Sequence, residues 1–134
     1  DLAEGSLVNI ERAARFGDEI GGHVLSGHIM RQVQVLDVQD TEYNRVIWME
    51  RPPALVPFIL DKGFVALNGC SLTIAEVEPT RFSVHLIPET RDVTTFGDVQ
   101  QGDQINLEVD AQTQAVVETV RQLLTDPQIL AQIK

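Results

Sequence analysis

The chain has 134 residues, enough for one domain with its own hydrophobic core. Apolar residues make up 43% and charged residues 22%, the usual balance of a soluble globular domain. The net charge of −10 disfavours nucleic acid and anionic membranes as partners, and no apolar run reaches the roughly 20 residues that span a bilayer. Cys70 is the only cysteine, so no internal disulfide can form, which fits a cytoplasmic location.

The first eleven residues resemble a segment 97 residues further along the chain. Residues 1–11 read DLAEGSLVNIE and residues 98–108 read DVQQGDQINLE. The match indicates either a repeat, in which residues 1–11 end an earlier similar domain, or two unrelated strands that share a glycine turn. Polar and apolar positions agree together, which favours the repeat. Because the chain begins with Asp1 and not Met, we also expect a fragment or a processed product.

A polar connector (residues 12–20) and a glycine-interrupted apolar stretch (residues 21–38) come next. Alternation and β-branched residues predict strands at Arg31–Asp37, Asn44–Glu50, Gly63–Leu67, Ser71–Val77, Phe82–Ile87 and Gln104–Val109. Asn68–Gly69 is a dipeptide that tight hairpins prefer. A helix start is expected within Ala54–Leu60, and a full helix over residues 113–124, where five apolar residues share one face. Pro127 lies just past the end of that helix.

Short strands separated by turn signals every eight to twelve residues are typical of a small barrel or sandwich. We therefore expect an all-β fold, a six-stranded antiparallel Greek-key (split) barrel with short helices and a C-terminal helix. The sequence has no Gly-rich phosphate loop and no alternation of strands with helices, so a dinucleotide-binding fold is not indicated.

Two histidines and two hydroxyl residues stand out as candidate site residues. His23 and His28 are five apart, which is not the spacing of a helical metal site, and in a strand they would face opposite sides. One histidine facing a pocket is therefore the favoured interpretation, and no metal site is expected. Ser71 and Thr73 share one face of a strand, either as a polar clamp or as exposed groups.

Other polar residues have ordinary structural interpretations. Cys70 is most simply a small buried apolar residue, and His85 alternates with apolar neighbours. Asp110 lies between the last strand and the helix, where an N-cap is favoured over a carboxylate that orients a catalytic group. Thr90 can cap a turn or bond a polyol.

Five stretches occur in an order and at spacings that suggest one family. They read VNIERAARFGDEIGGHVLSGHIM, KGFVALNGCSLTIAEV, FSVHLIPET, TTFGD and INLEVDAQTQAVV. Together they resemble the C-terminal half of riboflavin synthase, over about residues 1–124. In that family the fold is a tandem of two similar six-stranded barrels, which agrees with the repeat. The resemblance implies that residues 1–11 end a mostly absent first barrel, residues 12–111 form a lumazine-binding barrel, and residues 112–134 form an oligomerisation helix and tail.

The resemblance also implies an activity. Riboflavin synthase is a transferase that moves a four-carbon unit between two molecules of 6,7-dimethyl-8-ribityllumazine, giving riboflavin and a ribitylamino-pyrimidinedione, without a metal or organic cofactor. Its active site lies between the N-terminal barrel of one subunit and the C-terminal barrel of a neighbour, usually in a homotrimer held by C-terminal helices. The alternative is a non-catalytic antenna protein that binds lumazine or flavin as a chromophore.

The family's site residues fall on matching positions of this chain. The resemblance assigns catalytic roles to His28, Ser71, Thr73 and Asp110, and ligand contacts to Gly27, Lys62, Ser71, Thr73, Ile87 and Thr90. One departure is the missing first barrel, whose NGCC stretch carries a cysteine where this chain has Ser71. The resemblance therefore predicts binding of one lumazine or flavin, with full activity doubtful for this chain alone.

Overall fold

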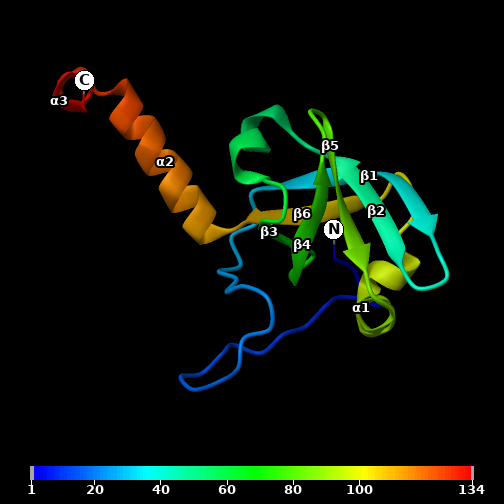
Figure 1. The fold of residues 1–134 in the computed structure, drawn as a ribbon. Coiled ribbons are helices and arrows are strands. Elements are labelled where there is room, and N and C mark those ends of the chain that lie inside the picture. Colours follow the sequence, from blue (N-terminus) through cyan, green and yellow to red (C-terminus); the bar gives the residue numbers. More distant parts are fainter. Residues whose placement is uncertain (1, 134) are drawn as a thin grey trace.

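The computed structural model describes residues 2–133, and its centre is a closed barrel of six antiparallel strands (Figure 1). The strands are β1 (Arg31–Asp40), β2 (Arg45–Glu50), β3 (Phe64–Leu67), β4 (Cys70–Val77), β5 (Arg81–Leu86) and β6 (Gln104–Val109). Their order around the barrel is β1-β2-β5-β4-β3-β6. Strands β3, β4 and β5 follow one another as neighbours and β6 returns beside β3, which is a Greek key. The predicted fold class is confirmed.

The six predicted strands all form, with small shifts at their ends. β1 runs on to Asp40, and its pairing with β2 shifts register between Val35 and Asp37, which is the effect of a β-bulge. The β3–β4 turn has positive φ at both Asn68 (46°) and Gly69 (77°). Positive φ at both central residues is the type I′ geometry, so the predicted tight hairpin is confirmed.

The barrel interior is packed with apolar side chains. Along β4, Leu72 and Ile74 are buried in the core, whereas Ser71 and Thr73 alternate with them. Successive side chains of a strand point to opposite faces, so the two hydroxyl residues stand on the outer wall of the barrel. The core therefore holds the fold together, and the groups available for chemistry lie outside it.

Short helices connect the strands. They are η1 (Pro53–Phe58), α1 (Pro88–Val93), η2 (Thr95–Asp98), α2 (Ala111–Thr125) and α3 (Pro127–Ile133). The helix start expected within Ala54–Leu60 is a 3-10 turn, because Pro57 inside it cannot donate a backbone hydrogen bond. The one turn of helix at α1 was not predicted; Pro88 occupies its first position, where proline is favoured. Pro127 likewise opens α3 instead of ending the helical region.

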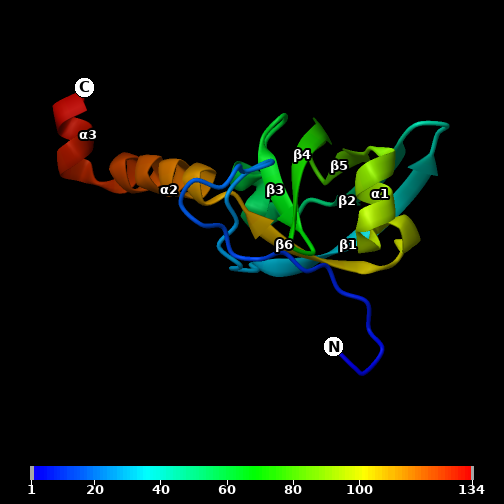
Figure 2. The same cartoon turned by 90° about the horizontal axis from the view of Figure 1, so that it is seen from below.

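Helix α2 projects from the barrel, and none of its side chains is buried (Figures 1 and 2). The apolar face predicted for it is largely exposed, as at Val116 and Leu124. Only Val117 packs against the core, and the Arg121 guanidinium lies 5.5 Å from the centre of the Phe58 ring. No helix in residues 2–133 is long and apolar enough to cross a membrane.

The N-terminal segment contains no strand between residue 2 and residue 30, and it runs along the outside of the barrel (Figure 2). Asn9 anchors it. The Asn9 side-chain amide donates to Asn68 O at 2.9 Å, and its Oδ1 accepts from the Thr95 backbone N–H at 2.8 Å. Asp1, which the repeat aligns with Asp98, lies outside the described residues.

Candidate functional site

A row of three outward-facing residues crosses neighbouring strands on the barrel wall. Ala66 of β3 lies opposite Ser71 of β4 on one side and opposite Glu108 of β6 on the other. Ala66 between the two polar residues is only 1% exposed, so other parts of the chain cover the middle of the row. Backbone of residues 22–27 contacts both ends of this row, so this segment and the wall form one site.

At one end of the row, Ser71 bonds His23 twice. The His23 backbone N–H donates to Ser71 Oγ at 3.0 Å, and Ser71 Oγ lies 2.6 Å from His23 Nδ1. Gly22 makes this approach possible, since its φ is +92° and a Cβ there would lie 2.3 Å from Ser71 Oγ. Only glycine adopts this conformation without strain, and only glycine leaves room for the serine hydroxyl.

The His23 ring forms one wall of a pocket. It stacks on Phe64 with ring centres 5.1 Å apart and planes 20° from parallel. The pocket has a volume of about 570 Å³ and is lined by Ile20, Gly22, His23, Val24, Ser26, Phe64, Asp110, Ala111 and Gln112. It combines flat aromatic surface with an imidazole, a hydroxyl and a carboxylate, the mixture found in small-molecule sites.

Asp110 stands at the edge of this pocket as the N-cap of α2. Its carboxylate accepts from the Thr113 backbone N–H at 3.3 Å and from Thr113 Oγ1 at 2.9 Å. The predicted capping role is confirmed, and the carboxylate also lines the cavity. The two interpretations of Asp110 weighed from the sequence are therefore compatible.

At the other end of the row, Glu108 holds the segment that carries His28. Glu108 Oε1 accepts from the Ser26 backbone N–H at 2.8 Å and from Ser26 Oγ at 2.9 Å, and Oε2 accepts from the Gly27 N–H at 3.1 Å. Ser26 Oγ lies 3.2 Å from Nδ1 of His28. A buried carboxylate, a hydroxyl and an imidazole thus form a chain beside the pocket.

The structure brings some of the predicted site residues together. Ser71 adjoins the pocket through its contact with His23. Asp110 lines the pocket directly. His28 is exposed, does not line this pocket, and reaches it through Ser26. Thr73 is exposed and pairs with Phe64 across the β3–β4 ladder.

Other predicted ligand contacts lie further out. Lys62 is exposed at a positive φ of 62° before Gly63. Ile87 and Thr90 lie at the start of α1, at the end of the barrel away from α2 (Figure 1). Neither residue lines the His23 pocket.

The two histidines lie outside regular structure. Residues 21–30 form no strand, so the alternation that a strand would impose does not decide which way His23 and His28 point. Among the described residues, no group of three or more His, Cys, Asp or Glu side chains could hold a metal ion.

Cys70 lies next to Ser71, and its thiol is partly buried. Burial raises the pKa of the Cys70 thiol, and the negative charge of Glu11 raises it further. A raised pKa keeps the thiol protonated near neutral pH and makes it a poor nucleophile. This agrees with the structural interpretation of Cys70.

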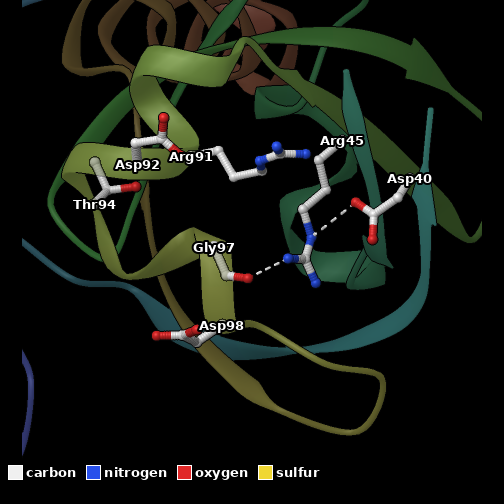
Figure 3. A pocket seen from close by; sticks show the side chains of 7 residues that line it. All are labelled: Asp40, Arg45, Arg91, Asp92, Thr94, Gly97 and Asp98. Atoms are coloured by element: carbon white, nitrogen blue, oxygen red, sulfur yellow. Dashed lines mark hydrogen bonds and ion pairs between the residues drawn. The ribbon is translucent and has the colours of Figure 1, made fainter. Parts of the chain in front are cut away.

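A second pocket, of about 440 Å³, lies between the β1–β2 end and the α1–η2 region (Figure 3). Its lining residues are Asp40, Arg45, Arg91, Asp92, Thr94, Gly97 and Asp98. The Arg45 guanidinium donates to the carbonyl oxygens of Gly97 and Val99 and lies 3.6 Å from Asp40. Arg45 thus holds η2 against the barrel. Of the other charged lining residues, Asp92 and Asp98 are acidic and Arg91 is basic.

A closed antiparallel barrel with an aromatic and polar pocket on its outer wall has the features of a small-molecule-binding barrel domain. Residues 26–110 match the model of the lumazine binding domain family. The chain belongs to that family. The matched span contains all six strands and ends at Asp110.

Curated relatives are similar to this chain over a longer span than the residues matched by the family model. Riboflavin synthase of Escherichia coli (strain K12) is 53% identical over 125 residues, which are 92% of this chain and 59% of the relative. Riboflavin synthase of Chlamydia trachomatis is 42% identical over 129 residues, 96% of this chain and 63% of the relative. The chain therefore spans about three fifths of the length of these relatives.

Solved structures share the fold. The structure of LumP complexed with riboflavin has a TM-score of 0.63 at 25% identity, covering 71% of this chain and 52% of that one. The structure of LumP complexed with 6,7-dimethyl-8-(1'-D-ribityl) lumazine has a TM-score of 0.62 at 21% identity, covering 72% and 51%.

Proposed function

We propose that this chain is the C-terminal half of a riboflavin synthase and binds one ribityllumazine or riboflavin on the outer wall of β3 and β4. The observation that carries the proposal is the pocket in which His23 stacks on Phe64 beside Ser71 and Asp110. Its volume of about 570 Å³ lies within the range of small-molecule sites.

The pocket supplies the groups that a ribityl-substituted pteridine needs. A flat ring packs against aromatic faces, and its carbonyls and ring nitrogens accept hydrogen bonds. His23 Nε2 is buried without a hydrogen-bond partner among the described residues, which costs about 1–3 kcal/mol. Since the nitrogen is closed off in this geometry, a polar ligand atom would remove that cost only with a turn of the His23 ring toward the pocket.

The reaction assigned to the whole enzyme is the transfer of a four-carbon unit between two lumazine molecules. The C7 methyl of the lumazine is acidic, because its anion is delocalised into the ring. Holding two rings face to face is mainly a matter of orientation, and moving protons near neutral pH suits imidazole and hydroxyl groups. In this proposal His28, Ser71, Thr73 and Asp110 serve the chemistry and Gly27 and Lys62 contact the ligand, whereas Ile87 and Thr90 do not line the His23 pocket and would contact only a part of the ligand that extends beyond it.

A second barrel belongs to the same proposal. The relatives are longer than this chain, and residues 1–11 repeat the pattern of residues 98–108. We assign residues 1–11 to the end of a first barrel. The complete site then lies between that barrel of one subunit and residues 12–111 of a neighbour, in a cytoplasmic homotrimer that buries the exposed apolar residues of α2.

Titration with riboflavin, followed by its fluorescence, tests the binding site. Thr73→Val should weaken binding by about 1–3 kcal/mol if the hydroxyl bonds a buried ligand atom. Ser71→Ala should weaken it at least as much, because it also releases His23. Thr80→Val, at an exposed threonine in the β4–β5 turn, is the matched control and should bind like wild type. Equal affinity for folded wild type and Thr73→Val would remove Thr73 from the site.

Measuring lumazine consumption distinguishes the enzyme from the non-catalytic antenna protein. The two riboflavin synthases described above are 53% and 42% identical to this chain, whereas the LumP chains are 21–25% identical, which favours the enzyme. A riboflavin synthase half should bind lumazine and consume it slowly alone, because one wall of the site is supplied by the other barrel. Joining the chain to a first barrel should raise the rate of lumazine consumption strongly. Binding without any turnover in the joined protein would support the antenna.

A further inference from the structure

The buried carboxylate of Glu108 is a chemical group that the proposed function leaves unused. Only 7% of the residue is exposed, and no Lys, Arg or His of the described residues forms a salt bridge with it. A buried carboxylate without a cation is costly unless hydrogen-bond donors satisfy it. Here every recorded contact of both oxygens is with a donor in Ser26 or Gly27.

The direction of the hydrogen bond between Ser26 and Glu108 determines the direction of the contact between Ser26 and His28. A serine hydroxyl has one hydrogen to donate, and Ser26 Oγ lies 2.9 Å from Glu108 Oε1, which as a carboxylate oxygen can only accept. Ser26 Oγ can therefore only accept at its 3.2 Å contact with His28 Nδ1. The hydrogen of the neutral imidazole then lies on Nδ1, and Nε2 keeps its lone pair.

We propose that Glu108 and Ser26 are positioning residues that hold neutral His28 in the tautomer with hydrogen on Nδ1. Free histidine prefers the opposite tautomer, with hydrogen on Nε2, so this state needs a fixed acceptor at Nδ1. The consequence rests on the proposed function: Nε2 of His28 can accept the proton released by the C7 methyl of the lumazine. The imidazolium that forms keeps its Nδ1 hydrogen bond to Ser26, and the electron pair of the broken C–H bond stays in the ring system.

Two features of the wall favour positioning over a purely structural anchor. Glu108 lies in the same cross-strand row as Ser71, so the two histidine-bearing ends of residues 22–28 are held by one stretch of sheet. The backbone N–H groups of Ser26 and Gly27 already anchor the segment. The bond from the Ser26 hydroxyl is additional to these anchors, and it sets the hydrogen on His28.

The tautomer is measured directly by two-bond proton–nitrogen NMR of the 15N-labelled chain at about pH 8.5, roughly two units above the ordinary histidine pKa. In wild type we expect a pyrrole-type Nδ1 resonance and a pyridine-type Nε2 resonance for His28. Ser26→Ala keeps the backbone anchors and removes the hydroxyl, so the two resonances should exchange character. Ser26→Thr keeps a hydroxyl and should restore the wild-type pattern.

Glu108→Gln should also move His28 toward the ordinary tautomer, because an amide cannot accept at both positions. Glu50→Gln is its matched control, since Glu50 also accepts a backbone N–H, from Gln34 at 2.8 Å, away from His28. If Glu108→Gln does not fold, the two Ser26 variants decide. A wild-type His28 with hydrogen on Nε2, or an unchanged pattern in Ser26→Ala, overturns the inference.

The same samples separate this inference from the proposed function. Riboflavin titration of wild type reports on the function and does not depend on the tautomer. Absence of riboflavin binding with the Nδ1–H tautomer present overturns the function and leaves the Glu108–Ser26–His28 chain standing. Riboflavin binding with the Nε2–H tautomer overturns the chain and leaves the function standing.

Discussion

Residues 1–11 and residues 98–108 share a sequence pattern, and their described parts share one turn, but only the second segment contains a strand. In each, a glycine with φ near +90° (Gly5, +89°; Gly102, +94°) forms the turn. The Ser6 N–H donates to Ala3 O at 3.0 Å, and the equivalent Asp103 N–H donates to Gln100 O at 3.1 Å. After the turn, residues 104–109 pair with β1 and β3, whereas residues 7–11 pair with no strand in the described chain.

Equivalent side chains in the two segments differ in how much of them is exposed to solvent. Ile105 and Leu107 are 1% and 0% exposed, and their counterparts Val8 and Ile10 are 50% and 86% exposed. Local sequence is therefore sufficient for the turn, and the strand requires neighbouring strands with which to pair. This is the expected consequence of cross-strand pairing being the unit of sheet stability.

Truncating the equivalent apolar residues Leu107 and Ile10 should give the largest contrast. Leu107→Ala should destabilise the chain by about 2–5 kcal/mol, because it leaves a cavity in a packed interior. Ile10→Ala should change the free energy of unfolding by less than about 0.5 kcal/mol. Urea unfolding of both variants measures this. A large loss for Ile10→Ala would mean that residues 7–11 are packed in the protein as Leu107 is.

The equivalent glycines should differ less. Gly102→Ala should cost about 1–2 kcal/mol, from left-handed backbone alone, since a Cβ there meets nothing within 4 Å. Gly5→Ala faces the same local strain, but its segment is not part of the cooperative barrel, so global stability should hardly change. Thermal unfolding by circular dichroism compares them, and equal losses would contradict the independence of the two turns.

For the equivalent asparagines, we expect the larger effect in the N-terminal segment, at Asn9, and the smaller one in the barrel, at Asn106. Asn9 makes two part-buried side-chain hydrogen bonds, to Asn68 O and from the Thr95 N–H. The Asn106 side chain makes one exposed bond, from Gln32. Asn9→Ala should therefore cost about 1 kcal/mol and free the segment to proteolysis, while Asn106→Ala costs less. Limited proteolysis gives the clearer readout, and an unchanged cleavage rate in Asn9→Ala would show that the anchor is elsewhere.

The equivalent glutamates give the smallest expected effect. Glu108 binds the Ser26 and Gly27 amides, whereas Glu11 acts through its charge on Cys70. Glu11→Gln should lower the pKa of the Cys70 thiol slightly and leave it above its ordinary value, because burial is the larger cause. Alkylation rates against pH measure the change. A pKa that returns fully to the ordinary range would assign the whole effect to Glu11.

The fold was predictable because each strand carries its own signal. The alternation of Ser71 and Thr73 with Leu72 and Ile74 is visible in the sequence, as is the Asn68–Gly69 hairpin. The turn of helix at α1 was missed, because Pro88 following an apolar strand indicates only that the strand ends.

The position of candidate site residues was predictable only where they lie on regular structure. Alternation placed Ser71 and Thr73 on one face, but it could not choose between His23 and His28 on a segment without regular structure. Glu108 was missed for a different reason. A charged residue at an alternating position normally faces solvent, and its burial depends on Ser26 and Gly27, about 80 residues away in the chain.

The placement of the pocket on the outside of the barrel has an evolutionary consequence. In the proposed site, positions that set stability and positions that would meet a ligand alternate along one strand, so mutation can change either set while the other is kept. A duplicated barrel of this design can diverge in ligand preference, or lose its ligand altogether, and remain a folded partner for its sibling copy. Mutational libraries restricted to the outward positions of β3 and β4 should accordingly yield mostly folded proteins with altered recognition.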